Sequence, residues 1–403
     1  MPVFAPHCRL RVLTALATAM AAAPALAAQP DEGLHLYGGI GWAYDDNLLR
    51  IADGEAPFEG RRSDAYQTYE AGVVYNKRIG RQRLAATAKV SKVTFDHFDQ
   101  LDYDGRDIEA TWNWEVGNKW EGRAQTLHVQ TLAPYTDFRS DQRNLRRQRR
   151  NMFDAGYKLH PSWKLRAGAT RDKYTYELLV QRYNDRVEKT YEAELLYQPR
   201  SGSALGLVAR RLKGSYPFRR PFAPGIAADD FTQDELKARV SWLATGSTTV
   251  QGLLGYARRD QPSYGAGKTD GFNGRINAIY APRGKLSYTA AAWREFAAIE
   301  SPSVSYTLNK GASLGATWQA RAKLGIEASA LYERRAYNAR FVFPGSGDLT
   351  DAIRSATLRA TWQARRKVQV VAAYAYQART GSPVLGTGKF DANTVQVSAN
   401  VLF

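Results

Sequence analysis

The sequence has almost no cysteine and little methionine or histidine. Among 403 residues there are one Cys, three Met and five His. The single Cys8 excludes a disulfide framework and, because it lies in the N-terminal segment described next, also thiol catalysis in the mature chain. No two histidines have the spacing of a metal-binding motif, so no metal site is predicted. Long hydrophobic runs are lacking as well. After residue 27 no apolar stretch approaches the roughly 18 residues of a membrane-spanning helix.

The first 27 residues predict a secretory signal peptide. Arg9 and Arg11 precede a short apolar stretch at 12–23, Pro24 breaks it, and Ala25-Leu26-Ala27 offers the small residues that a signal peptidase requires. The mature chain is therefore expected to form one domain, residues 28–403. The formal charge of +17 becomes +15 without the two leader arginines. An exported chain of this charge is expected to meet anionic polymers or lipopolysaccharide phosphates rather than nucleic acid.

Apolar residues occupy every second position in segment after segment. At 106–116 one face carries Ile108, Ala110, Trp112, Trp114 and Val116, with polar residues between them. The same pattern returns at 235–242, 272–280, 324–332 and 368–376. Such alternation indicates strands with one apolar and one polar face. About eighteen segments of roughly ten residues predict a closed antiparallel transmembrane β-barrel.

The connections between these segments alternate in length. Short ones are predicted at 117–119, 160–162, 244–247, 281–284, 319–323 and 363–367, and long ones near 45–64, 131–150, 213–230, 260–270, 335–351 and 379–391. Short periplasmic turns and long outer loops are typical of outer-membrane barrels. Six of the nine tryptophans lie beside short turns, which predicts an aromatic girdle at the periplasmic boundary. They are Trp114, Trp120, Trp163, Trp242, Trp318 and Trp362.

Two further sequence patterns support this arrangement of strands and connections. Ala316-Thr317-Trp318-Gln319-Ala320-Arg321 returns 44 residues later as 360–365, so the repeating unit is predicted to be a hairpin. The last segment alternates Val395, Val397, Ala399 and Val401 with polar residues and ends at Phe403. An apolar terminal strand that ends in an aromatic residue resembles the signal read by the barrel-assembly machinery, which is therefore an expected partner.

No motif predicts an enzyme. Gly311-Ala312-Ser313-Leu314-Gly315 matches a hydrolase nucleophile pattern, but Ser313 lies within a predicted strand rather than on a strand-to-helix turn. Gly265-Ala266-Gly267-Lys268-Thr269 has Pro262 where the phosphate-binding motif requires its first glycine, and no helix is expected to follow, so an outer loop is predicted instead. The acidic segment around Asp102 is interpreted as a solvated outer loop rather than a calcium site. No cofactor is expected.

Basic residues gather in two predicted outer loops. One loop carries Arg143, Arg146, Arg147, Arg149 and Arg150. The other carries Lys213, Arg219 and Arg220 among Tyr216, Phe218 and Phe222. Such loops fit either an anionic glycan or lipopolysaccharide phosphates. The predicted lumen face mixes acidic and basic residues, so no clear ion selectivity is expected.

Two segments carry a resemblance to a known family. Tyr44-Asp45-Asp46-Asn47-Leu48-Leu49-Arg50 and Leu101-Asp102-Tyr103-Asp104-Gly105, the latter followed by Ala110-Thr111-Trp112-Asn113-Trp114, are similar to EpsL-type outer-membrane proteins associated with exosortase and exopolysaccharide gene clusters. The resemblance implies passage of an extracellular polysaccharide through the barrel, together with periplasmic and inner-membrane export proteins and without catalytic residues.

The first functional hypothesis is therefore a polysaccharide export channel, and the second is a general or sugar-specific porin. The residues predicted to contact the polysaccharide are Asp45, Asp46, Asn47, Arg50, Lys237, Arg239, Arg275 and Arg359.

Overall fold

A computed structural model describes residues 32–218, 230–261, 268–298, 304–339, 349–382 and 387–403. The predicted signal peptide lies outside the described residues. The strands are β1 Gly33–Asp45, β2 Asp64–Ile79, β3 Gln82–Phe95, β4 Tyr103–Val116, β5 Trp120–Leu132, β6 Leu145–His160, β7 Trp163–Tyr176, β8 Arg186–Tyr197, β9 Ala204–Ser215, β10 Phe231–Leu243, β11 Thr248–Asp260, β12 Lys268–Tyr280, β13 Leu286–Ala297, β14 Val304–Arg321, β15 Leu324–Ala339, β16 Thr350–Arg365, β17 Val368–Arg379 and β18 Phe390–Leu402.

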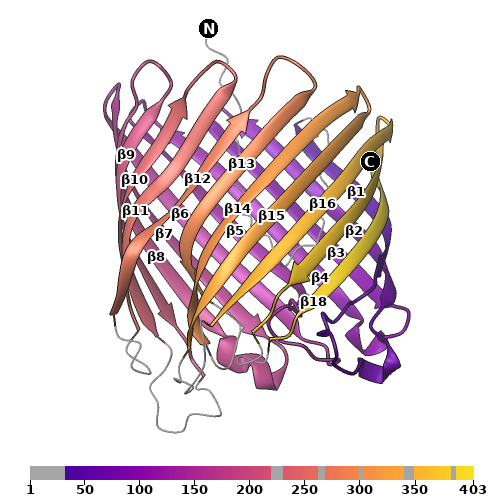
Figure 1. Ribbon diagram of the computed structural model, residues 1–403. Coiled ribbons are helices and arrows are strands. Elements are labelled where there is room, and N and C mark those ends of the chain that lie inside the picture. Colours follow the sequence, from indigo (N-terminus) through magenta and orange to yellow (C-terminus); the bar gives the residue numbers. More distant parts are fainter. Residues whose placement is uncertain (1–31, 219–229, 262–267, 299–303, 340–348, 383–386) are drawn as a thin grey trace.

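The strands form one closed antiparallel barrel (Figure 1). Each strand pairs with its neighbours in sequence, and β1 pairs with both β2 and β18, so the sheet has no free edge. Closure matters because unpaired backbone groups in hydrocarbon cost several kcal/mol each. The predicted fold, including about eighteen strands, is confirmed.

Short turns lie at one end of the barrel and long loops at the other. Residues 80–81 and 322–323, for example, connect strands by two residues at the end where β1 begins and β18 ends (Figure 1). We number the long loops L1 to L9 in chain order; those used below are L1 (46–63), L2 (96–102), L3 (133–144), L4 (177–185) and L9 (380–389). Because outer-membrane barrels have short periplasmic turns and long outer loops, the long-loop end is the outer end.

The arginine-rich segment is not a loop, contrary to prediction. Of its five arginines only Arg143 lies in L3; Arg146, Arg147, Arg149 and Arg150 belong to β6. Lys213 likewise lies in β9, whereas Arg219, Arg220 and Phe222 lie outside the described residues. Near the outer end of a strand both faces contact water or head groups. Apolar residues therefore stop alternating before the strand stops, and the sequence loses its strand signal.

The repeated sextet adopts the same local structure at both positions. β14 and β16 each end in a two-residue turn, and each has a register shift near its end, between Gln319 and Arg321 and between Gln363 and Arg365. In both cases the glutamine side chain donates to a backbone oxygen two residues later, at 2.8 Å. The predicted hairpin unit is confirmed.

The two faces of the wall differ as the alternation predicts. Large apolar side chains such as Leu314 and Leu236 are exposed on the outside. At the short-turn end Trp120 and Trp163 pack beside Tyr157 and Tyr197, with ring centroids 4.8 and 4.9 Å apart, and the predicted girdle is confirmed. A closed barrel with an apolar outer belt and interfacial aromatic rings belongs in a membrane. The protein is an outer-membrane β-barrel of a Gram-negative bacterium.

Three short 3₁₀ segments complete the described structure. They are η1 Phe58–Gly60, η2 Asp99–Leu101 and η3 Leu179–Asn184. Within the described ranges, no helix is both long and apolar enough to cross a membrane.

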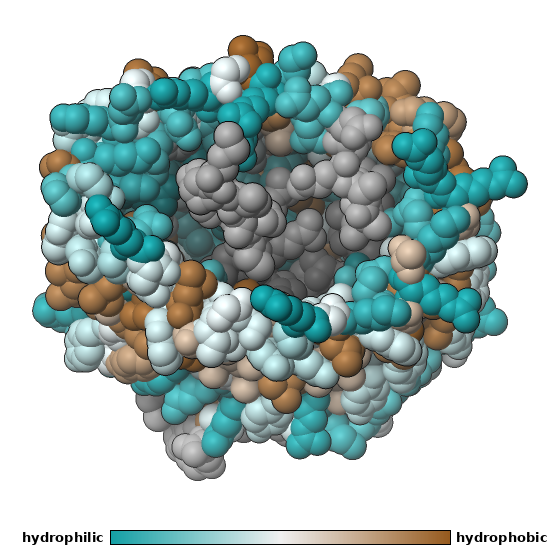
Figure 2. Space-filling model, turned by 90° about the horizontal axis from the view of Figure 1, so that it is seen from above, coloured by the Kyte–Doolittle hydropathy of each residue, from teal (hydrophilic) through white to brown (hydrophobic). Residues whose placement is uncertain are grey.

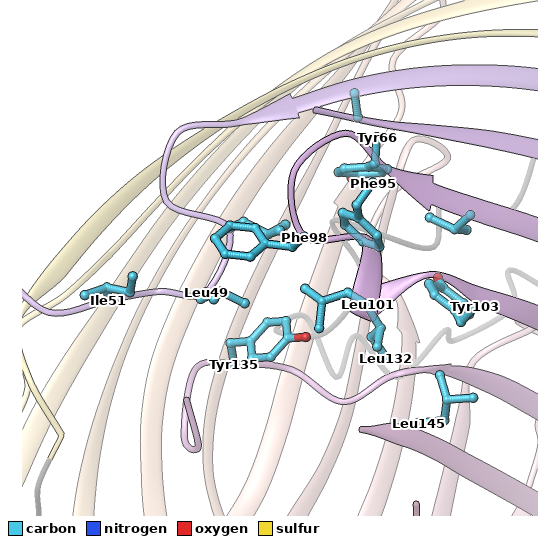
Figure 3. Packing of buried hydrophobic residues seen from close by; sticks show 13 residues of the cluster. Leu49, Ile51, Tyr66, Phe95, Phe98, Leu101, Tyr103, Leu132, Tyr135 and Leu145 are labelled. Carbon is cyan, nitrogen blue, oxygen red and sulfur yellow. The ribbon is translucent and has the colours of Figure 1, made fainter. Parts of the chain in front are cut away.

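L1, L2 and L3 fold against the inside of the wall. Leu49 and Ile51 from L1, Phe98 and Leu101 from L2, and Tyr135 from L3 are buried (Figure 3). They belong to one hydrophobic cluster with Leu48 of L1 and with residues of β1 to β6. These wall residues are Ala43, Tyr66, Val93, Phe95, Tyr103, Leu132 and Leu145. We call this group the mouth cluster. It holds three loops over one side of the lumen at the outer end.

Candidate pore and outer mouth

The lumen is visible from the short-turn end as a hollow surrounded by the barrel wall (Figure 2). Positions that alternate with the exposed apolar residues point into it. On β8 to β10 and β12 to β15 these inward positions carry many charges, which we call the charged wall. Its members are Glu192, Glu194, Arg210, Glu235, Lys237, Arg239, Arg275, Glu295 and Glu333.

Lys237 and Arg239, two of the predicted ligand residues, lie on this wall in neighbouring inward positions of β10. Lys237 Nζ lies 2.8 Å from Glu235 Oε2 and donates to Asn273 Oδ1 at 2.8 Å. Arg239 pairs with Glu192 at 3.1 Å and also with Glu194. Both cations are therefore already paired within the wall.

Arg275, on β12, is paired in the same way. Its Nη2 lies 2.7 Å from Glu295 Oε2, and its guanidinium lies 4.5 Å from the centre of the Trp293 ring. Trp293 Nε1 in turn donates to Glu333 Oε2 at 2.8 Å. Because the charged wall has five acidic and four basic members, it carries little net charge. This matches the expectation of a lumen without clear ion selectivity.

Arg359 lies apart from this group, on β16. It stands directly opposite Glu327 of β15 in the strand register. The structure therefore separates Arg359 from Lys237, Arg239 and Arg275, and the sequence alone did not indicate this separation.

The remaining four predicted ligand residues form the turn that begins L1. Asp45 is buried and accepts hydrogen bonds from the backbone N of Asn47 at 2.9 Å and from Thr394 Oγ1 at 2.7 Å. It also pairs with Arg50 at 2.8 Å. Arg50 has a φ of 55°, which is unusual for a residue with a side chain, and this ion pair helps to hold it there.

Asn47 and Asp46 complete the turn. Asn47 exchanges hydrogen bonds with the backbone of Ile51, at 2.8 and 2.9 Å. Asp46 accepts from the backbone N and the side chain of Asn393 on β18, at 2.6 and 2.7 Å. The described contacts of all four residues are intramolecular and fix L1 to the wall. Polysaccharide binding by the eight residues stays a prediction.

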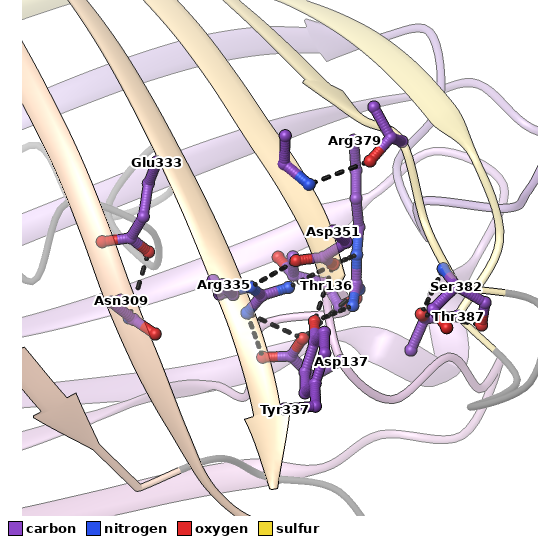
Figure 4. A network of polar contacts seen from close by, with 12 residues as sticks. Thr136, Asp137, Asn309, Glu333, Arg335, Tyr337, Asp351, Arg379, Ser382 and Thr387 are labelled. Atoms are coloured by element: carbon purple, nitrogen blue, oxygen red, sulfur yellow. Dashed lines mark hydrogen bonds and ion pairs between the residues drawn. The ribbon is translucent and has the colours of Figure 1, made fainter. Parts of the chain in front are cut away.

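L3 crosses the outer mouth and is anchored on the far side. Asp137 lies 3.1 Å from Arg335 of β15 and 3.3 Å from Arg379 of β17 (Figure 4). Arg379 also donates to the carbonyl of Thr136. β15 and β17 lie on the other side of the lumen from β5 and β6, between which L3 runs. L3 is therefore a bridge.

Asp351 of β16 organises the anchor. Its carboxylate accepts from Arg335 at 3.0 Å, from Arg379 at 2.5 Å and from Tyr337 Oη at 2.7 Å. The Asp351 side chain is fully buried, and those of Arg335 and Arg379 are 6% and 1% exposed. Charge-assisted hydrogen bonds of this kind are about twice as strong as neutral ones.

L3 also contacts L1. Arg139 lies 2.7 Å from Glu55. Burial lowers the pKa of Arg139, Arg379 lowers it further, and Glu55 opposes both effects. Burial in the mouth cluster likewise raises the pKa of Tyr135, with smaller contributions from Tyr103 and Asp141. L3 is therefore held by the apolar contact of Tyr135 and by the ionic contacts of Asp137 and Arg139.

Sequence reasoning missed the anchor formed by Asp137, Arg335, Asp351 and Arg379. The alternation does place Arg335 and Asp351 on inward positions near the outer ends of their strands, which is a usable signal. Nothing in the sequence connects them to Asp137, however, because loop residues show no period.

Of the remaining motif residues, Ser313 lies in the barrel wall and Asp102 in L2. Ser313 lies in the middle of β14, opposite Ala291 and Leu331, without the sharp turn that a nucleophile elbow requires. Asp102 accepts from the backbone N of Phe95 at 2.8 Å and so stabilises L2. Residues 265–267 of the glycine-rich segment lie outside the described residues, and Lys268 and Thr269 begin β12. Within the described part of the chain no cluster of His, Cys, Asp and Glu is arranged to hold a metal.

Comparison with known proteins gives only distant structural similarity. No family model and no curated protein matches the sequence. Pseudomonas aeruginosa OccK2 (OpdF), solved with glucuronate, is similar at 16% identity and a TM-score of 0.49 over 93% of this chain and 98% of that one. P. aeruginosa OpdK, solved with vanillate, is similar at 12% identity and a TM-score of 0.48 over 92% of this chain and 99% of that one. Acinetobacter baumannii OccAB3 is similar at 10% identity and a TM-score of 0.46 over 92% of this chain and 99% of that one. Such values assign no ligand to this chain.

Proposed function

We propose that the protein is a passive channel for small hydrophilic solutes across the outer membrane. The observation that carries the proposal is a hollow barrel with a polar lumen whose outer mouth is narrowed by the L3 bridge. Paired charges on the inner wall keep the lumen wet without binding one type of ion strongly. A channel of this kind sorts solutes mainly by size.

Liposome swelling tests this proposal. The purified barrel is reconstituted into liposomes, and swelling rates are measured in isosmotic solutions of mono-, di- and tetrasaccharides. We expect fast swelling with the monosaccharide and a steep decrease with size, because L3 narrows the outer mouth. Absence of swelling with every solute would contradict a diffusion channel.

Asp137→Ala sharpens the test. This substitution removes the carboxylate that joins L3 to Arg335 and Arg379. We expect the swelling rate to increase most for the largest sugar. Asp141→Ala is the matched control, since Asp141 lies on the same loop and no ion pair is described for it. Equal size dependence in both variants would show that L3 does not limit passage.

Export of a polysaccharide, the function implied by the resemblance, is the second candidate. Its support is that the two resembling segments, separated by about fifty residues, meet in the mouth cluster through Leu48, Leu49, Leu101 and Tyr103. A polymer would have to displace L3, which makes small-solute diffusion the better fit to this geometry. Deletion of the gene, scored for exopolysaccharide at the surface and in the periplasm, separates the two functions. Retention of the polymer in the periplasm favours export, and unchanged secretion excludes it.

A further inference from the structure

The outward face of β6 to β9 carries a dense group of basic residues near its outer end. All are exposed, and all occupy the face that also carries the lipid-contacting apolar side chains. They are Arg147, Arg149, Arg171, Lys173, Lys189 and Lys213. We call this group the outer-wall basic patch.

The strand register brings these like charges together. Arg149 stands opposite Lys173, and Arg171 stands opposite Lys189. Lys189 in turn stands opposite Lys213. Directly opposed side chains have Cβ atoms about 5 Å apart, and like charges in such pairs are destabilising. A bound external anion would offset this repulsion.

The described residues do not supply that anion. Arg147 donates to Gln130 Oε1 at 2.8 Å and Arg149 to His128 Nδ1 at 3.3 Å, and both acceptors are uncharged amide or imidazole groups. Across the described ranges, no member of the patch forms an ion pair with a carboxylate. Arg211, which neighbours the patch on β9, is different: Asp234 neutralises it through contacts of 2.5 and 2.9 Å.

A recess of about 190 Å³ opens in the patch, lined by Arg149, Asn151, Arg171 and Lys173. Three cations and an amide around one small recess supply the kind of donors that bind a phosphate group, whose oxygens accept bidentate bonds from arginine. Next to the recess, one outward position closer to the membrane centre, Phe153 and Tyr191 are half exposed. The recess thus lies at the boundary between apolar wall and water.

We propose that the outer-wall basic patch binds the phosphate groups of lipopolysaccharide, the anionic glycolipid of the outer leaflet. The patch is outside the lumen and continuous with the apolar belt, so its ligand must present phosphate and acyl chains together. A lipid presents both. A polymer that passes through the channel would contact neither the outer-wall basic patch nor the apolar belt. The site is independent of the solute that crosses the barrel.

Titration of the folded barrel in detergent with purified lipid A tests the proposal. The patch variant combines Arg149→Gln, Arg171→Gln, Lys173→Gln and Lys189→Gln. The control variant combines Arg283→Gln, Lys285→Gln, Lys323→Gln and Lys367→Gln, four exposed basic residues in the short turns. Since each basic residue near a membrane surface adds to the attraction for anionic lipid, we expect bisphosphorylated lipid A to bind the patch variant about 10-fold more weakly or worse. The control variant is expected to bind like the unmodified protein.

Three ligands separate the sources of phosphate. Lipid A without its phosphates should bind the unmodified protein as weakly as it binds the patch variant. Inorganic phosphate alone and a soluble anionic polysaccharide should bind far more weakly than lipid A. Equal affinity of the patch and control variants overturns the proposal, as does phosphate-independent lipid A binding or equally tight binding of either soluble anion. Heat-dependent migration in gels verifies that both variants are folded.

Discussion

Two parts of the lumen surface are built on different principles. On the β1 to β6 side, the mouth cluster packs apolar residues of L1, L2 and L3 against the wall and excludes water. On the β8 to β15 side, paired charges such as Lys237 and Glu235 leave the wall polar. The first arrangement immobilises loops, because removing apolar surface from water stabilises contacts that have no fixed direction. The second keeps the lumen hydrated and electrically balanced.

The L3 anchor combines features of both parts. It is ionic like the charged wall, but Asp351, Arg335 and Arg379 are as deeply buried as the mouth cluster. Partly exposed ion pairs contribute about 0–1 kcal/mol each. Breaking a buried pair costs about 3–5 kcal/mol, since the partner keeps its charge without compensation. Burial therefore decides how much each ion pair matters.

The largest effect is expected at the anchor. Asp351→Ala leaves Arg335 and Arg379 with Asp137 as their only described carboxylate partner, so the free energy of unfolding should decrease by about 3–5 kcal/mol. Urea unfolding of the reconstituted barrel, followed by tryptophan fluorescence, measures the change. Asp391→Ala, at an exposed position, is the control and should change the free energy by less than about 0.5 kcal/mol. Similar values for the two variants would mean that the anchor adds no stability.

The mouth cluster should respond to loss of packing. Phe98 is fully buried. Phe98→Ala should lower the free energy of opening L2 by about 3 kcal/mol, because apolar contact is lost and a cavity remains. Hydrogen exchange of residues 96–103 reports this local opening. Leu179→Ala removes a side chain that is 72% exposed on L4 and should leave exchange nearly unchanged. Unaltered protection of L2 in Phe98→Ala would argue against a packed mouth.

The charged wall should affect selectivity more than stability. Glu192 neutralises both Arg210 and Arg239, so Glu192→Gln should shift permeation toward anions by about 2-fold. Arg239→Gln should shift it toward cations. Reversal potentials in a KCl gradient measure both changes. Asp234→Asn on the outward face is the control and should have no effect. If neither lumen variant differed from this control, the charged wall would not line the conducting path.

The smallest expected effect is a dependence of the stability of L4 on pH. Burial raises the pKa of Asp185 above its ordinary value of 3.8, although a hydrogen bond from the backbone N of Tyr176 opposes the shift. The folded loop therefore holds the proton more tightly than the unfolded loop. The resulting stabilisation is fully present below pH 3.8 and is lost as the pH rises through the raised value. Hydrogen exchange at Tyr176 should be slower at pH 4 than at pH 7 after correction for intrinsic rates. Asp185→Asn should abolish the difference, and a difference that persists in this variant would have another origin.

The sequence alone determined the barrel. Strict alternation, short turns and interfacial tryptophans predicted the strand number, the closed sheet and the inward positions of Lys237, Arg239 and Arg275, because strand geometry imposes a period of two on side chains. The prediction was wrong for Arg146 to Arg150, where both faces of β6 are polar. It also did not separate Arg359 from the charged wall.

Only the tertiary structure decided how the outer mouth is arranged. Asp137 and Arg335 are 198 residues apart, and the mouth cluster joins three loops that connect three different pairs of strands. Strand period is a local property of the chain, whereas these contacts depend on how loops fill the space that barrel closure brings together. For that reason the strands of the wall could be predicted from the sequence, and the L3 bridge across the outer mouth could not.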